Sequence, residues 1–444
     1  AMAIHCLVAG DYLRPRQYTI EALILHFAID QIVNVDGTVS NWVLMGVIVR
    51  LALRMGLHRD PSHWPSIRPL QAELRRRLWI SLYQMDFFTS VQVGLSRIIK
   101  DAQCDTQPPS HLAGQDLTLD VGAADSGSIA VPTPPLFIVQ RNGIIKVAAA
   151  IYDATEEQPG PSPEMLSTLS LQLDAAIQSV PDAFTYTTFE ASIVDGPIIT
   201  LHRVVLDILI QKTVYLLHRQ SFKPLSNTEG SSTEISSAEN VSHSNSQTFV
   251  SQDECIRAAL FILEHQERLD RETVPGGHLY DIRWKVAASL NHEALQATMM
   301  LCFALSSFES TWPKRAASYP ADKEIREKIT GALSKVKAQW EAKPELSAET
   351  QKAVQAVTAV LKRNQKGLKS KDQAHDQLPV FNTGPDLSSS SALQDAAFLD
   401  PMLAFQNPES FDFNMFDFGG SIDPTTIDPL LYDPNFDFEG SGNP

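Results

Sequence analysis

Two short motifs carry residue types that perform catalysis in other proteins, and both are incomplete. His58-Arg59-Asp60 has the order of the catalytic tripeptide of protein kinases, but the Asn expected downstream of it is missing and the chain has no glycine-rich loop. His292-Glu293 begins like the zincin motif, in which a second His one helical turn later completes a zinc site. That later position is Gln296. The sequence therefore excludes a kinase and a zinc peptidase.

The other reactive side chains form no recognisable catalytic or metal-binding pattern. All-helical isoprenoid synthases need clustered aspartates for magnesium, whereas the acidic residues of the body are dispersed among basic ones. A nucleophile elbow and a Walker loop are also absent from the sequence. The four cysteines lie too far apart for a disulfide framework or a close-spaced zinc site: Cys6, Cys104, Cys255 and Cys302. We therefore expect no catalytic, cofactor-binding or metal-binding residue in this chain, and no enzyme.

The charge of the chain is concentrated at its C-terminal end. The 444 residues include 36 Lys and Arg and 52 Asp and Glu, which gives a net charge of −16. Residues 372–444 hold 13 acidic residues and no Lys or Arg, so the first 371 residues carry only −3. Broad binding of nucleic acid needs an excess of cations that neutralise phosphates. The near-neutral body therefore argues against such binding by this chain.

Aromatic residues alternate with the acidic residues of this tail. Nine Phe or Tyr lie between Phe398 and Phe438, and repeated Asp-Pro pairs disfavour regular helix. A segment with this charge cannot collapse into a core, so its aromatic side chains stay available to a partner with a basic-rimmed groove. A tail that only confers solubility needs no Phe, so we predict an activation segment over 372–444. The residues expected to contact a coactivator are Phe411, Phe413, Phe416, Phe418, Leu430, Leu431, Tyr432, Phe436 and Phe438.

Two basic stretches have both a functional and a structural interpretation. Arg75-Arg76-Arg77 lie on a predicted helix, so they point in different directions and are expected to reach water, Glu73, Asp86 or other helices. The second stretch ends a predicted helix, where the helix dipole favours cations, and it leads into the tail. A nuclear localisation signal is an equally good interpretation of its residues, which are Lys362, Arg363, Lys366, Lys369 and Lys371.

Apolar residues recur at helical spacing through the body, first in Tyr18–Val33, then in Trp42–Gly56, then in a helix from about Leu70. Strand-like alternation is weak and confined to Leu136–Val139. No apolar run is long enough to span a bilayer, and we expect no secretory signal because the first residues lack a basic stretch before their short apolar run. The sequence predicts an intracellular all-α protein, an irregular multi-helix bundle with long loops and a disordered acidic C-terminal tail. The apolar face of the third helix is expected to include Leu74, Leu78, Leu82 and Phe88.

Composition divides the chain into four segments. Residues 226–251 are rich in Ser, Thr and Asn, which predicts a solvated linker. We expect residues 1–225 and 252–365 to be two parts of one helical domain on either side of this linker, and residues 372–444 to be the tail. Because Ala1 falls inside an expected helix, we also expect the natural protein to begin further upstream.

Several segments of the body together match the pattern of one family. They are Trp42-Val43-Leu44-Met45-Gly46, Gly56-Leu57-His58-Arg59-Asp60-Pro61, Glu73-Leu74-Arg75-Arg76-Arg77-Leu78-Trp79, Asp86, Pro108-Pro109, Leu217-His218-Arg219, and the helix from Asn291-His292 to Leu305. On these residues the body resembles the fungal-specific transcription factor domain, the middle homology region of fungal binuclear zinc-cluster transcription factors. Gly94-Leu95-Ser96 departs from the Gly-Arg-Pro that is common in this family. We expect Trp42 and Trp79 to be core and His58-Arg59-Asp60 to form a helix end with internal salt bridges.

The resemblance implies a regulatory module of a nuclear transcription factor. In the family such modules restrain or license activation, commonly dimerise, and in some members respond to a small-molecule effector. Family members bind DNA through an N-terminal six-cysteine cluster that holds two zinc ions, and no residue of this chain matches that cluster. Zinc and DNA binding are therefore expected only of a missing N-terminal domain.

We interpret the chain as the regulatory and transactivation portion of a fungal transcription factor that controls RNA polymerase II transcription of a specific gene set. The tail would recruit coactivator or Mediator-type proteins in the nucleus, and no membrane is involved. Two alternatives stay open. The first is a co-regulator or adaptor without a DNA-binding domain of its own, and the second, less in keeping with the motifs, is an all-α enzyme with a disordered tail.

Overall fold

A computed structural model of the protein describes residues 2–16, 18–33, 39–110, 133–157, 160–192, 194–222, 238–316, 322–343 and 347–373. These residues form α-helices and short 3-10 turns without a strand, so the predicted all-α class is confirmed for the described chain. The helices are α1 (Met2–Ala9), α2 (Thr19–Val33), α3 (Val39–Arg54), α4 (Pro69–Val93), α5 (Pro134–Glu156), α6 (Pro163–Gln178), α7 (Phe189–Ser192), α8 (Pro197–His218), α9 (Ala238–Glu272), α10 (Arg283–Ala316), α11 (Asp322–Glu341) and α12 (Ala348–Gln373).

Prolines and hydroxyl side chains set where several helices begin. Helices α4, α5, α6 and α8 all start with Pro, whose missing N–H costs nothing in the first turn. The Thr133 hydroxyl caps α5 by accepting a hydrogen bond from the Leu136 N–H at 3.3 Å. This capped start makes Leu136–Val139 the first turns of a helix. The weak strand expected there is therefore wrong.

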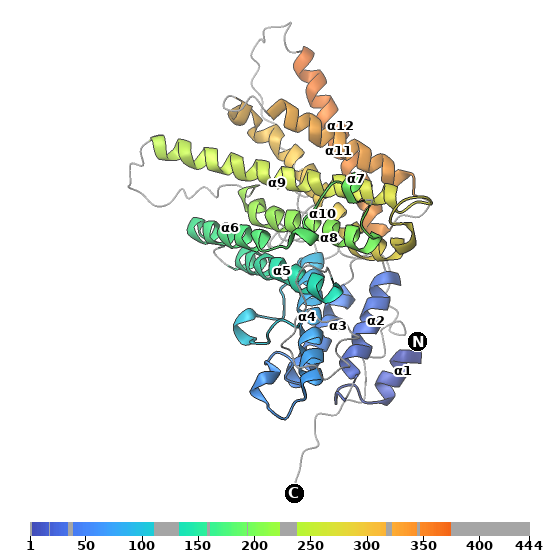
Figure 1. Cartoon of the computed structure of the whole chain (residues 1–444). Coiled ribbons are helices and arrows are strands. Elements are labelled where there is room, and N and C mark those ends of the chain that lie inside the picture. The colour runs from blue at the N-terminus through green and yellow to red at the C-terminus, as the bar shows by residue number, and fades with distance from the viewer. Residues whose placement is uncertain are drawn as a thin grey trace, which may run out of the picture.

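The helices pack around two hydrophobic cores. The first core is built from α2 to α6 with part of α8, and the second core from α8 to α12. Figure 1 shows α1–α4 at one end of the molecule and α9–α12 at the other, with α5, α6 and α8 between them. Helix α8 belongs to both cores, because Leu206 and Leu209 pack into the first and Val204 and Ile208 into the second. This helix joins the two halves of the fold.

Three of the four residues expected on the apolar face of α4 pack into the first core, namely Leu78, Leu82 and Phe88. Leu74 was also expected on this face, but it is 51% exposed, whereas Trp79 and Phe87 are buried. The same helix also buries Glu73 and Asp86, which are 7% and 1% exposed. Polar residues thus occupy inward positions on α4, so its apolar residues alone did not reveal the face that packs.

Helix α9 extends into the segment that was expected to be a linker. It begins at Ala238, inside the predicted linker 226–251, and the Gln252 amide donates a hydrogen bond to the Ser221 carbonyl at 3.0 Å. Residues 223–237 lie outside the described residues. Helix α12 ends at Gln373, and the tail that follows it also lies outside the described residues. Among the helices that the structure describes, none is both long and apolar enough to cross a membrane.

Candidate functional site

The motif Gly56–Pro61 forms a tight corner between α3 and α4. Gly56 has a φ of +71°, a left-handed conformation that glycine adopts without the steric penalty of a Cβ atom. The Leu57 N–H then donates to the Ala52 carbonyl at 3.0 Å, which closes the end of α3. Leu57 is buried in the first core. The corner thereby turns Asp60 toward α4.

Asp60 is a buried carboxylate with several donors around it. Arg76 donates from Nε at 2.9 Å and from Nη2 at 2.8 Å, and the backbone N–H groups of Ser62 and Gln107 add bonds of 3.0 and 2.9 Å. These bonds, led by those from Arg76, hold the pKa of Asp60 well below its usual range. The ion pair is therefore charged at neutral pH, and it ties the corner to α4 and to the segment around Gln107. The expected helix end with internal salt bridges is present here.

Replacing Asp60 with Asn should destabilise the protein in a pH-dependent way. A carboxyl whose pKa is lowered by folding stabilises the fold above its unfolded pKa of about 3.9, and this stabilisation is lost as the pH falls toward the folded pKa. We expect Asp60→Asn to lower the free energy of unfolding by about 2–3 kcal/mol at pH 7 and by less at pH 3. Urea unfolding of both proteins between pH 3 and pH 7 measures the difference. A difference that does not shrink toward acid pH would contradict this assignment.

The other two arginines of the triplet have separate partners. Arg75 donates from Nη2 to a backbone carbonyl at the end of α3 at 2.8 Å. Arg77 donates from Nε to Glu73 at 2.9 Å, and Glu73 also accepts hydrogen bonds from the N–H and hydroxyl of Ser110 at 3.0 and 2.9 Å. The prediction that the triplet reaches Glu73 and other elements is confirmed. Asp86, the other expected partner, bonds elsewhere.

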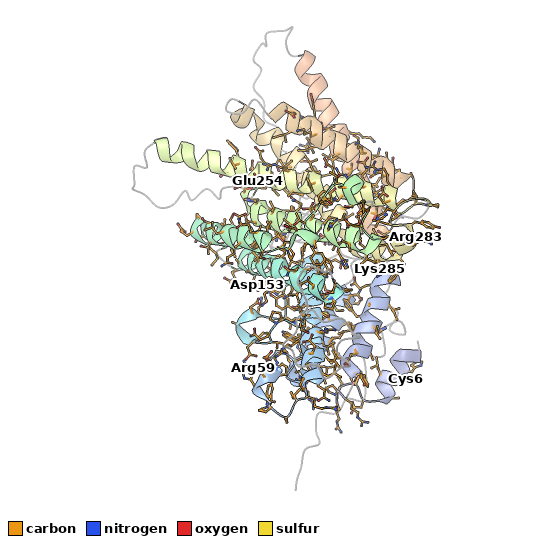
Figure 2. The ribbon with its side chains drawn as sticks, viewed as in Figure 1. Cys6, Arg59, Asp153, Glu254, Arg283 and Lys285 are labelled. Carbon is orange, nitrogen blue, oxygen red and sulfur yellow. The ribbon has the colours of Figure 1, made fainter. Side chains whose placement is uncertain are left out.

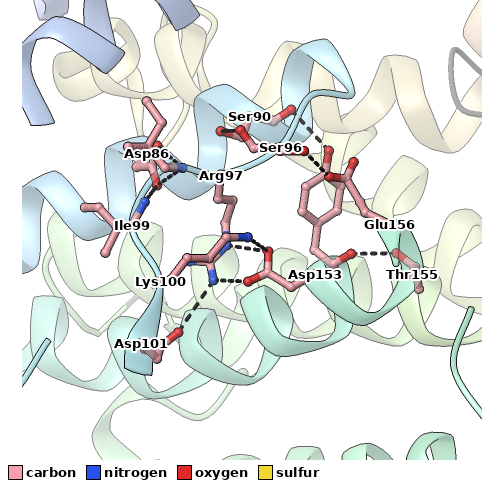
Figure 3. A network of polar contacts seen from close by, with 12 residues as sticks. Asp86, Ser90, Ser96, Arg97, Ile99, Lys100, Asp101, Asp153, Thr155 and Glu156 are labelled. Atoms are coloured by element: carbon pink, nitrogen blue, oxygen red, sulfur yellow. Dashed lines mark hydrogen bonds and ion pairs between the residues drawn. The ribbon is translucent and has the colours of Figure 1, made fainter. Parts of the chain in front are cut away.

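Asp86 holds the chain that follows α4. Gly94 ends the helix with a φ of +67°, after which the buried Asp86 carboxylate accepts hydrogen bonds from the Ile98 and Ile99 N–H groups at 3.1 and 2.9 Å (Figure 3). Burial raises the pKa of Asp86, and the two N–H donors act in the opposite direction. Residues 94–99 are thereby fixed against α4 although Gly-Leu-Ser replaces the family's common Gly-Arg-Pro.

Arg97 connects this turn to α5 through a buried ion pair. Its guanidinium donates to Asp153 from Nη2 at 2.7 Å and from Nε at 3.1 Å, and its side chain is 0% exposed (Figure 3). Lys100 lies 3.1 Å from the same carboxylate, and Asp101 lies 3.5 Å from Arg97. Burial alone would lower the pKa of Arg97, but the hydrogen bonds that it donates to Asp153 outweigh burial, so its pKa is raised. The pair is charged and fixes the position of α5 against α4.

A small cavity lies against residues of both networks. It has a volume of about 50 Å³, enough for roughly three or four water molecules. Burial raises the pKa of the Cys104 thiol to about 11 and that of Tyr83 above its usual range, so both stay protonated at neutral pH. The lining therefore offers no activated nucleophile. Its residues are Arg76, Trp79, Ile80, Tyr83, Asp101, Cys104, Thr106, Gln107, Pro108, Asn142 and Lys146.

The residues present do not fit a zinc site. Within the part of the chain that the structure describes, no group of three or more His, Cys, Asp or Glu lies close enough together to hold a metal ion. Cys6 is exposed on α1 (Figure 2), Cys104 is partly buried, and Cys255 and Cys302 are buried in the C-terminal half. The four thiols are all free, and zinc binding finds no ligand set among them.

The structure reaches only part of the predicted partner-binding residues. The nine aromatic and leucine residues predicted to contact a coactivator, from Phe411 to Phe438, lie outside the described residues. Lys362 and Arg363 are exposed near the end of α12, and the other three cations of that stretch follow them in the last turns of this helix.

Several polar residues of the site gave no signal in the sequence. Asp105 accepts a hydrogen bond from the Asp60 N–H at 2.8 Å and lies 2.8 Å from His63 Nε2. Arg97 and Asp153 are 56 residues apart, and neither belongs to a recognisable motif. Only the spatial neighbourhood of these residues shows their role.

These networks define a helical domain in which charged residues connect α4 to α5 and to the neighbouring turns, and the networks do not form a catalytic centre. Residues 34–169, which contain all of them, match the fungal specific transcription factor domain, so the chain contains this domain. No solved structure matches the chain.

Longer stretches of the chain are similar to curated fungal proteins. The chain is 35% identical over 371 residues to the Zn(2)-C6 fungal-type transcription factor pigI of Monascus ruber, a match that covers 82% of this chain and 43% of that protein. It is 32% identical over 408 residues to the Zn(2)-C6 fungal-type transcription factor mpsB of Macrophomina phaseolina, which covers 90% of this chain and 52% of that protein. The equisetin cluster transcription factor eqxF of Fusarium heterosporum is 31% identical, over 81% and 48%. The chain thus spans about half the length of these relatives.

Proposed function

We propose that this chain is the regulatory and transactivation portion of a fungal transcription factor that controls RNA polymerase II transcription of a specific gene set. The observation that carries the proposal is the similarity of four fifths or more of the chain to Zn(2)-C6 fungal-type transcription factors. In this proposal the protein acts in the nucleus and has no enzymatic role. Sequence-specific DNA binding through a zinc cluster would require residues other than those of this chain.

The proposed division of labour follows the composition of the chain. Residues 1–225 and 252–365 would form the regulatory domain, and residues 372–444 would be the activation segment. The ion pairs of Asp60 with Arg76 and of Arg97 with Asp153 support a rigid regulatory body, because each pair connects two elements of the fold. The basic residues from Lys362 to Lys371 would serve nuclear import. Partners would be coactivator or Mediator-type proteins at the tail, a second copy of the chain, and a small-molecule effector at the body.

A reporter assay tests the activation segment directly. Residues 372–444 fused to a foreign DNA-binding domain should activate a reporter gene. Changing Phe411, Phe413, Phe416 and Phe418 to Ala should remove most of the activity, about tenfold, because aromatic anchors carry most of the binding energy at such contacts.

The tail offers a matched control with the same number of alanine substitutions. Ser388, Ser389, Ser390 and Ser391 lie in the same segment and carry no aromatic ring, so their replacement by Ala should leave activity intact. Immunoblots must show equal amounts of the fusion proteins. Full activity without the four phenylalanines would reject docking through the aromatic residues, and an inactive wild-type tail would reject the activation function itself.

A further inference from the structure

Polar side chains gather at a place where the two cores meet. The polar seam, as we call it, consists of Arg141 on α5, Lys212 on α8, and His292, Glu293 and Gln296 on α10, around the ring of Phe88 on α4. The Gln296 amide donates to the Val91 carbonyl of α4 at 3.3 Å, so the α10 side of the seam reaches α4. Four helices that are distant in sequence therefore contribute to one polar region inside the body.

Arg141 is a partly buried arginine whose guanidinium lacks a carboxylate partner among the described residues. Among the described residues no acidic side chain pairs with it, and its Nε atom is buried without any hydrogen-bond partner. Its guanidinium carbon lies 4.9 Å from the ring centroid of Phe88, and, in addition to burial, its charge helps to lower the pKa of His202. Burial lowers the pKa of Arg141 to about 10, so the group is still charged at neutral pH. A partly buried cation with a buried and unpaired Nε is costly unless an anion accompanies it.

Lys212 adds a second cation on the same aromatic ring. Its Nζ lies 5.6 Å from the Phe88 centroid and 2.7 Å from Oε1 of Glu293. Lys212 and Glu293 are 2% and 7% exposed, so they form a buried ion pair that neutralises itself. The remaining charged group of the seam is Arg141. The seam therefore has an excess of one positive charge.

His292 and Gln296 contribute unused polar atoms one helical turn apart. Both ring nitrogens of His292 and the Oε1 atom of Gln296 are buried without a partner among the described residues. Burial, followed by the charge of Lys212, lowers the pKa of His292 to about 3, so its ring is neutral and has one N–H to donate. Buried polar atoms are nearly always bonded in folded proteins, so this concentration of open positions points to a ligand.

We propose that the polar seam binds the carboxylate of a small organic acid, with Arg141 as the main contact and Lys212, His292 and Gln296 beside it. A monoanion matches the single excess charge, and the planar guanidinium suits the two oxygens of a carboxylate. Phe88 packs against the first core, and Leu295, which lies between His292 and Gln296 in the sequence, packs against the second, which favours a ligand with a hydrocarbon body over an inorganic ion. Since α5 and α10 belong to different cores, such a ligand would fasten the two halves to each other. The meaning of this site for gene regulation rests on the proposed function, whereas its binding chemistry does not.

The test measures the melting temperature of the purified chain in sodium benzoate, butyrate, phosphate, sulfate and chloride at equal ionic strength. Benzoate or butyrate near saturation should raise Tm by about 3 °C or more over chloride, because a ligand that binds only the folded state stabilises it. Arg141→Gln should lose this rise and weaken binding by about 30-fold or more. Arg257→Gln is the matched control, because Arg257 is an exposed arginine on α9, and it should respond like the wild type.

Two further results keep the test decisive. Should Arg141→Gln fail to fold, His292→Phe keeps a ring of similar shape without its nitrogens and should lose the benzoate response. An equal response of wild type and both variants to every salt would overturn the site. A response to phosphate and sulfate as large as that to benzoate would overturn the assignment to an organic acid. Because no transcription is measured, failure of this binding is distinguishable from failure of the proposed function.

Discussion

Replacing Asp153 with Ala should lower the free energy of unfolding by about 3–5 kcal/mol, because it leaves the buried guanidinium of Arg97 without its main partner. The Arg97 side chain is fully buried, and its closest remaining carboxylate would be Asp101 at 3.5 Å. Lys100 would lose the same partner, so three connections between the Gly94 turn and α5 disappear together. Urea unfolding followed by far-UV circular dichroism measures the loss.

A surface aspartate of a neighbouring helix provides the control for this experiment. Asp174 is exposed on α6, so Asp174→Ala removes a carboxylate of the same type without leaving a buried cation unpaired. We expect its unfolding midpoint to remain close to that of the wild type. The double variant Arg97→Met with Asp153→Ala should regain part of the stability that Asp153→Ala loses, since no unpaired charge remains. Equal losses in Asp153→Ala and Asp174→Ala would contradict the importance of the buried pair.

Glu293→Ala should have an effect of similar size in the other half of the molecule. It leaves the Lys212 ammonium, 2% exposed, without the carboxylate that lies 2.7 Å away, and we expect a loss of about 3–5 kcal/mol in the free energy of unfolding. Adding Lys212→Met to this change should recover part of the loss. The double-mutant cycle of these substitutions gives the coupling energy of the pair.

An exposed pair of the same chemistry gives the comparison for Glu293. Glu324 lies 2.8 Å from Lys328 on α11, with side chains 69% and 61% exposed. Solvent screens such a pair, so Glu324→Ala should change stability little. A coupling energy near zero for Lys212 and Glu293 would mean that the buried pair is not maintained in solution.

The helices were predictable because local rules determine them. Apolar periodicity located α2, α3 and α4, and Pro163 and Pro197 open α6 and α8 because proline suits the first turn of a helix. The start of α5 was missed because Leu136–Val139 was judged by its alternation and not by the preceding Thr133 cap. The start of α9 was missed because its first turns have the composition of a linker.

The polar networks were much less predictable than the helices. Glu73 was foreseen as a partner of the arginine triplet because residues four apart on a helix face each other, as Arg77 and Glu73 do. Asp60 pairs with Arg76 across a corner, and Arg97 with Asp153 across two helices, so only the packed structure brings them together. Leu74 was also not predictable, because α4 buries the charged Glu73 and Asp86 where they have partners and leaves this leucine exposed.

The sharing of α8 by both cores has a consequence for cooperativity. Residues of α8 pack into both cores, so a substitution that destabilises the second core also weakens the packing of the first. We therefore expect the body to unfold as one thermodynamic unit, so that the stability of residues 34–169 depends on residues far beyond them. Substitutions in α10 or α12 should therefore lower the stability, and with it the abundance, of the domain at residues 34–169 without changing any residue of that domain.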